Sequence, residues 1–111
     1  MSTIFGKIIQ GELPAEKVFE NENFLVIKDR FPVAPVHLLI LPKQEITNLQ
    51  SATAEELSWM AELFFIVQKL ADDFQIADGY RLLTNNGTLA GQSVFHLHFH
   101  LIGGKELGPI A

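Results

Sequence analysis

The sequence contains no cysteine, and this absence excludes three kinds of chemistry at once. Without thiols, the chain cannot form disulfides, bind zinc through thiolates or use a cysteine nucleophile. Positive charge is also scarce, since 8 Lys and Arg face 13 Asp and Glu, for a net charge of -5. A protein that binds a nucleic-acid backbone needs an excess of cations, so we expect no nucleic-acid partner. A single nucleotide is not excluded, because backbone amides and a few polar side chains can hold one phosphate.

Long hydrophobic runs are absent as well. The longest, residues 36–41 and 60–67, are each interrupted by one polar residue and fall far short of the roughly 20 residues that span a bilayer. The N-terminus does not combine a basic segment with a long apolar one, as a secretory signal does. We therefore expect a cytoplasmic protein with no membrane partner.

What the sequence does have is a globular composition. Hydrophobic residues make up 48% of its 111 residues, which suits one domain over residues 1–111 with a single core. Ile4, Phe5, Ile8 and Ile9 predict a short helix that Ser2 or Thr3 would cap. Strands are expected over 15–20, 24–29, 36–41, 79–85 and 93–102. This order predicts an α+β fold, a five-stranded antiparallel sheet with one short N-terminal helix and one long helix.

The long helix should begin at the capping box formed by Thr53 and Glu56 and end near Phe74. Its predicted core face consists of Leu57, Met60, Phe64, Val67, Ala71 and Phe74. Further apolar residues fall largely outside that face, namely Trp59, Leu63, Phe65, Ile66 and Leu70. One small core cannot cover so much apolar surface, so we expect a homodimer formed through this helix. Ordinary scattered surface residues are the alternative interpretation.

Residues 94–102 alternate strictly, with histidine at every second position from His96 to His100. Because side chains on a strand alternate between faces, His96, His98 and His100 should share one face. The residues between them should face the core, namely Phe95, Leu97, Phe99 and Leu101.

Three interpretations of the histidine face remain open. The imidazoles could bind a metal, with His37 as the only further histidine. A neutral imidazole could instead attack phosphorus as a nucleophile while its neighbours move the proton of the leaving group. Some of the three could also be ordinary core histidines. The preceding residues Gly91, Gln92 and Ser93 favour the second interpretation, since such a turn can hold a phosphate with its backbone amides.

Residues 96–102 match the pattern His-φ-His-φ-His-φ-φ, with φ apolar, and in this the chain resembles the histidine triad (HIT) family. The resemblance covers nearly the whole chain. Residues 4–9, 14–15, 34–35, 42–43, 79–81 and 91–94, together with Asp29, His37 and Asn85, resemble the branch of histidine triad nucleotide-binding proteins.

The resemblance implies a homodimer in which the two sheets join, with no metal and no cofactor. It implies a hydrolase that cleaves purine nucleoside phosphoramidates or aminoacyl adenylates to the nucleoside monophosphate. The covalent intermediate would be a nucleotidyl-histidine. A dinucleoside polyphosphate hydrolase, as in another branch of the family, and a non-catalytic nucleotide-binding or interaction module are the alternatives.

The resemblance also implies a role for each site residue. His98 would be the nucleophile, His100 would handle the proton of the leaving group, and His96 and His37 would orient the imidazoles. The phosphate or leaving group would lie near Asn85, Gln92, Ser93 and the Val94 amide. Asp29 would accept from the ribose hydroxyls. The base would lie in an apolar slot formed by Ile4, Phe5, Ile8 and Ile27. Plain core packing and a turn role for Asp29 are the alternatives.

Two features depart from the branch. Arg30 occupies a position near the base that is usually apolar, and it could stack on the purine, pair with a carboxylate or point outward. The tail over residues 105–111 is short and lacks the tryptophan of well-studied members. Both departures bear on the choice of substrate.

Overall fold

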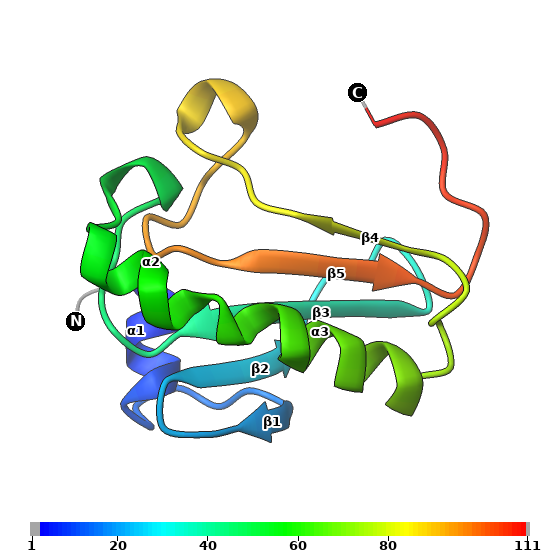
Figure 1. Ribbon diagram of the computed structural model, residues 1–111, viewed down its shortest axis with the longest axis horizontal. Coiled ribbons are helices and arrows are strands. Elements are labelled where there is room, and N and C mark those ends of the chain that lie inside the picture. Colours follow the sequence, from blue (N-terminus) through cyan, green and yellow to red (C-terminus); the bar gives the residue numbers. More distant parts are fainter. Residues whose placement is uncertain (1–2, 111) are drawn as a thin grey trace.

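The computed structural model describes residues 3–110, in which five antiparallel strands form one sheet with helices on both faces (Figure 1). The spatial order of the strands is β1-β2-β3-β5-β4. Their bounds are Lys17–Glu20 for β1, Phe24–Lys28 for β2, Val36–Pro42 for β3, Tyr80–Leu83 for β4 and Phe99–Gly103 for β5. The predicted α+β fold class is confirmed.

The helices begin where the caps in the sequence predict. In α1 (Ile4–Ile9), the Thr3 hydroxyl accepts the Gly6 N–H at 3.0 Å, whereas the alternative cap Ser2 lies outside the described residues. Thr53 and Glu56 form the expected capping box at the start of α2 (Ala54–Met60), which α3 (Glu62–Asp73) follows. Two 3-10 turns, η1 (Leu49–Ser51) and η2 (Thr88–Ala90), lie in the connections.

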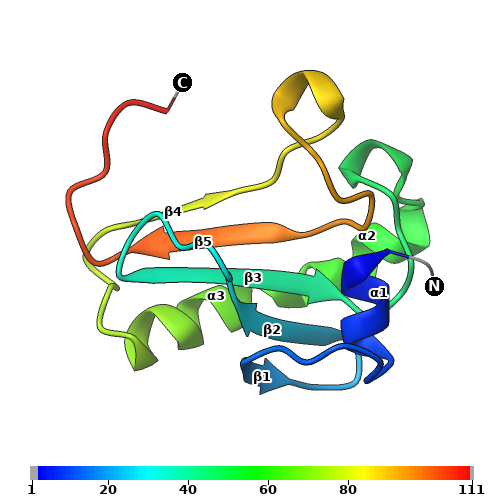
Figure 2. The same cartoon turned by 180° about the vertical axis from the view of Figure 1, so that it is seen from behind.

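The two faces of the sheet carry different cores. Alternate residues of β2 and β3, such as Val26 and Ile40, pack against α2 and α3, which cross one face (Figure 1). The intervening residues, such as Ile27 and Leu39, pack with Ile8 of α1 on the opposite face (Figure 2). Because α1 is only six residues long, it covers only one end of its face. This leaves space on the α1 face for a site.

The long helix differs from its prediction in two respects. A tight turn, in which the Phe64 N–H bonds to the Ala61 carbonyl at 3.1 Å, separates α2 from α3. The predicted core face was partly wrong, since Leu57 and Phe64 are 46% and 60% exposed. Met60, Val67 and Ala71 of the predicted face are buried, and so are the neighbouring residues Leu63, Ile66 and Leu70. Two apolar stripes lie side by side on this helix, and the 3.6-residue period alone could not decide where the buried face ends.

The last strand begins at Phe99, so the prediction of a strand from Ser93 was wrong for its first half. The Leu97 N–H donates to the Ile46 carbonyl at 2.6 Å, and the Thr84 hydroxyl donates to the His98 carbonyl at 2.7 Å. These backbone groups therefore have partners outside the sheet ladder. Strand β4 is likewise shorter than expected, because it ends at Leu83 instead of Asn85.

Among the described residues, no helix has the length and apolar character needed to cross a bilayer.

Candidate active site

Histidines from two neighbouring strands meet on the α1 face. His37 lies in β3 and His100 in β5, and these strands pair so that His37 is opposite Ile102 and Leu39 is opposite His100. His98 precedes β5 and packs edge-on against the Phe5 ring of α1, with centroids 4.8 Å apart. The predicted core face of this segment holds for Leu97, Phe99 and Leu101, but not for Phe95, which is 45% exposed.

A cavity of about 920 Å³ opens on this face, a volume within the range of small-molecule sites. It brings together ten of the predicted site residues: Ile4, Phe5, Ile8, Ile27, Asp29, Arg30, Ser93, Val94, His98 and His100. The apolar members come from α1 and β2, whereas the two histidines come from the segment 98–100. The cavity therefore has an apolar end and an imidazole end.

The surroundings of His98 determine which of its ring nitrogens is free. Its Nδ1 lies 2.8 Å from the His96 carbonyl oxygen. A carbonyl can only accept, so Nδ1 carries the proton and donates it to that hydrogen bond. In the neutral ring, Nε2 then holds a lone pair. Since His98 lines the cavity, the structure provides an imidazole with the protonation pattern of a nucleophile.

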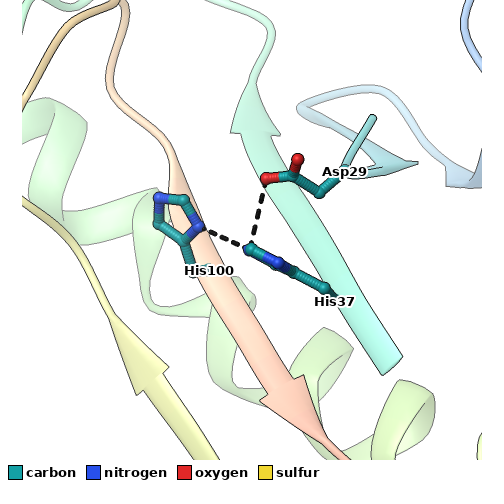
Figure 3. A group of neighbouring side chains, drawn as sticks. All are labelled: Asp29, His37 and His100. Atoms are coloured by element: carbon teal, nitrogen blue, oxygen red, sulfur yellow. Dashed lines mark hydrogen bonds and ion pairs between the residues drawn. The ribbon is translucent and has the colours of Figure 1, made fainter. Parts of the chain in front are cut away.

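His37, His100 and Asp29 form a second hydrogen-bonded group (Figure 3). The Val33 N–H donates to Nδ1 of His37 at 3.1 Å, which assigns the ring proton of His37 to Nε2. This Nε2 lies 2.9 Å from Nδ1 of His100 and 3.2 Å from Oδ2 of Asp29. Nδ1 of His100 is therefore an acceptor, and His100 keeps its own proton on Nε2.

Burial keeps these imidazoles neutral. Desolvation lowers the pKa of His98 and of His37 below the ordinary value of 6.5, although the Asp29 charge opposes this effect. Desolvation together with the neighbouring rings of His98 and His37 lowers the pKa of His100 to about 4. At pH 7 all three rings are therefore uncharged, as a nucleophilic imidazole requires.

His96 does not line the cavity. It is fully buried, and its Nε2 donates to the Pro42 carbonyl at the end of β3, at 2.8 Å. Its own carbonyl holds His98. Within residues 3–110, its Nδ1 has no hydrogen-bond partner. His96 thus fixes the position of His98, the residue directly before β5. The ring of His96 itself does not reach the cavity.

Gln92 is also buried and lies outside the cavity lining. Its side-chain oxygen accepts the Gly87 N–H at 2.8 Å, and its side-chain nitrogen donates to the carbonyls of Thr47 and Val94. Gly91 adopts a left-handed conformation with φ +95°, which allows the chain to turn there. The loop is held in place by Gln92, while Ser93 and Val94 line the cavity. Asn85 is half-buried and is not part of the cavity lining.

The structure tests the metal interpretation through its donor atoms. Asp29, His37 and His100 each offer one ligating atom, and these atoms lie within 4.8 Å of one another. However, Nε2 of His37 carries the proton because Nδ1 accepts from Val33. The nitrogen that faces the other two ligands therefore has no lone pair for a cation, and the geometry favours a chain of hydrogen bonds. His96 lies apart from this group, so the histidines at 96, 98 and 100 do not form one ligand set.

Sequence reasoning missed several residues of the cavity, most notably Phe31. This ring is 80% exposed in the loop between β2 and β3. A large aromatic residue in a loop that contains two prolines, Pro32 and Pro35, was the available signal, because exposing such a side chain to water is unfavourable. The C-terminal tail lies beyond the β4 edge of the sheet, far from α1 (Figure 1), and Arg81 donates to the Gly108 carbonyl at 2.8 Å.

Comparisons with known proteins identify the family. The family described as HIT domain matches residues 10–107. A HIT-like protein of Chlamydia pneumoniae is 60% identical over 109 residues, which covers 98% of this chain and 99% of the relative. The solved structure of a HIT family hydrolase from Clostridium thermocellum has a TM-score of 0.92 at 45% identity and covers 97% of this chain and 95% of that one.

A histidine triad nucleotide-binding protein from Candida albicans has a TM-score of 0.82 at 34% identity, covering 99% of this chain and 84% of that one. These likenesses extend over the whole sheet and both sides of the cavity. With the family match over residues 10–107 and the histidine arrangement described above, the chain belongs to the histidine triad (HIT) family.

Proposed function

We propose that the protein is a hydrolase that cleaves purine nucleoside phosphoramidates, or aminoacyl adenylates, to the nucleoside monophosphate. One observation carries the proposal: His98 presents an unprotonated Nε2 in a cavity of nucleotide size, because Nδ1 is committed to the His96 carbonyl. The similarity to a HIT family hydrolase and to a histidine triad nucleotide-binding protein supports it.

In this mechanism, Nε2 of His98 attacks the α-phosphorus and the bond to the leaving nitrogen or oxygen breaks. The positive charge that develops on the His98 ring is stabilised by the hydrogen bond to the His96 carbonyl. Water then attacks the nucleotidyl-histidine, which releases the nucleoside monophosphate and restores the ring. Splitting the reaction into two displacements replaces one difficult step with two easier ones.

His100 is the donor on the leaving-group side, because its proton is on Nε2 while Nδ1 accepts from His37. Its pKa of about 4 in the free chain is too low for a proton store at pH 7. An anionic phosphate bound beside the ring raises this pKa, since a nearby negative charge favours the protonated form. Substrate binding would thus allow His100 to take up a proton from solvent, which the ring then passes to the leaving group.

The rest of the cavity accommodates the nucleoside. The base would lie against the apolar end formed by Ile4, Phe5, Ile8 and Ile27, with Arg30 at the rim. Asp29 lines the cavity and lies beside His37, and its carboxylate would accept from the ribose hydroxyls. The phosphate would lie near Ser93 and the Val94 amide. Gln92 would act by holding that loop, and Asn85 would approach the leaving group.

The proposal includes a homodimer and a location in the cytoplasm. Phe64 and Phe65 of α3 are 60% and 74% exposed, and Leu57 of α2 is 46% exposed, so the two helices present apolar surface that a second copy would cover.

Replacing His98 with Asn tests the proposed function, because the amide retains hydrogen bonding but cannot form the intermediate. We expect the rate on an adenosine phosphoramidate to fall by several orders of magnitude, while nucleotide affinity and melting temperature are retained. His96→Ala is the comparison, and an equally mild loss in both variants would contradict the role of His98.

Diadenosine polyphosphate as a second substrate separates the two hydrolase branches, and activity in excess chelator excludes a metal nucleophile. Wild-type binding without turnover would indicate a non-catalytic module.

A further inference from the structure

Phe31 is an exposed aromatic residue at the edge of the cavity. The ring is 80% exposed and lines the cavity together with Phe5, Ile8 and Ile27. Val33, which is 59% exposed in the same loop, does not line it. A bound molecule with an apolar face would therefore remove the Phe31 ring from water at this point, and burial of that surface would stabilise the complex.

The loop that carries Phe31 is anchored to the histidine group. Oδ1 of Asp29 accepts the Phe31 N–H at 2.8 Å, while Oδ2 of the same carboxylate lies 3.2 Å from Nε2 of His37. Two residues further on, the Val33 N–H donates to His37. The backbone on both sides of Pro32 is thus tied to residues of the site. A loop whose backbone is held in this way loses less conformational entropy when the Phe31 ring contacts a ligand.

The apolar end of the cavity can cover one face of a planar ligand. Ile27 of β2 is 3% exposed and Ile8 of α1 is 8% exposed, so both are fixed in the core cluster between α1 and the sheet. A nucleobase has two flat faces, and a fixed aliphatic wall leaves one of them in water. Aromatic side chains stack on bases irrespective of sequence, because every base has a π face.

We propose that Phe31 forms the second wall of the base site, so that the base lies between the Phe31 ring and the aliphatic wall of Ile8 and Ile27. This inference rests on the proposed function and extends it to the recognition of the base. The ligands favoured are nucleotides with a purine, because the larger ring system overlaps more of the Phe31 ring than a pyrimidine does. Phe31 does not contact the reacting atoms, so its contribution is to binding.

Calorimetric titration of AMP and of ribose 5-phosphate tests the inference, since the two ligands differ only by the base. Phe31→Ala should weaken AMP binding by roughly tenfold and leave the affinity for ribose 5-phosphate unchanged. Phe31→Tyr should restore the affinity for AMP. Leu89→Ala, which removes a fully exposed apolar side chain that does not line the cavity, should leave both affinities unchanged.

Steady-state rates give a second readout. A contact made equally in the ground state and the transition state affects KM alone, so Phe31→Ala should raise KM for an adenosine phosphoramidate and leave kcat unchanged. An equal loss of affinity for both ligands, or a change in oligomeric mass with unchanged AMP binding, would overturn the assignment of Phe31. If the wild type binds AMP no better than ribose 5-phosphate, there is no base site and the proposed function fails with it.

Discussion

The two faces of the sheet show how one small domain separates stability from chemistry. On the face covered by α2 and α3, Leu63, Leu70 and Leu101 are at most 2% exposed and pack into one cluster. On the other face, α1 covers only one end, and the uncovered part holds the cavity with His98 and His100. Residues of β3 and β5 contribute to both faces in alternation, so neighbouring residues on one strand serve different purposes.

The largest stability effect should come from the face covered by α2 and α3. Leu101→Ala removes a fully buried side chain beside β3 and should reduce the free energy of unfolding by about 2–5 kcal/mol. Denaturant titration measures the loss. His98→Asn, three residues away on the other face, is the matched variant and should lose activity with little loss of stability. Equal destabilisation by both substitutions would contradict this separation of the two faces.

A smaller stability effect is expected in the loop that leads to the cavity. Gln92→Ala leaves the Gly87 N–H and the Thr47 carbonyl without their partners, which should cost about 1–3 kcal/mol. Because Ser93 and Val94 follow directly, we expect kcat to fall as well. Denaturant titration and steady-state rates on one preparation measure both effects. Retained stability with lost activity would instead indicate direct contact between Gln92 and substrate.

The pH dependence of stability should reflect His100, which lies on the sheet face that carries α1. His100 has a pKa of about 4 in the folded chain and about 6.5 when unfolded, so the unfolded state binds more protons between these values. The contribution of the neutral His100 ring to the free energy of unfolding is fully present above pH 6.5. It is lost progressively as the pH falls towards 4. The melting temperature should therefore decline over this range by more in the wild type than in His100→Gln. Identical slopes for the two proteins would show that His100 titrates normally.

The smallest stability effect should come from the outer surface of α3. Phe65→Ser changes an exposed side chain and should alter the stability of a single chain by less than about 0.5 kcal/mol. The same substitution should shift the mass measured by light scattering from that of two chains to that of one. Gln68→Ser, at an exposed polar position of the same helix, is the control. A wild type that is monomeric at high concentration would refute the dimer.

Local patterns predicted much of the fold. The caps at Thr3 and Thr53 and the apolar runs of β2 and β3 each depend on residues close in sequence, and the structure contains all of these elements. The family resemblance named His98, His100 and Asp29 as site residues, and the structure places all three on the lining of one cavity. The fold predictions succeed because they depend on caps and on periodicity within short segments.

The errors arise where distant residues decide the structure. The segment 93–98 alternates like a strand, yet Ile46 and Thr84 provide its backbone partners, and neither is visible from the segment itself. Gln92 is a plausible phosphate ligand from its position, but its amide is occupied by the backbone of Gly87, Thr47 and Val94. Tertiary hydrogen bonds of this kind cannot be derived from local propensity.

The carboxylate of Asp29 has a consequence for how this site could change. Its two oxygens hold the Phe31 backbone and approach the His37 ring, but it binds the loop only through a backbone N–H. The side chains at positions 30, 31 and 33 can therefore vary without loss of that support. A combinatorial library restricted to these three positions should yield catalysts with altered preference for the base, whereas libraries that include Asp29 should yield mostly inactive clones. New specificity can thus evolve in this protein by substitutions that leave the reacting group in place.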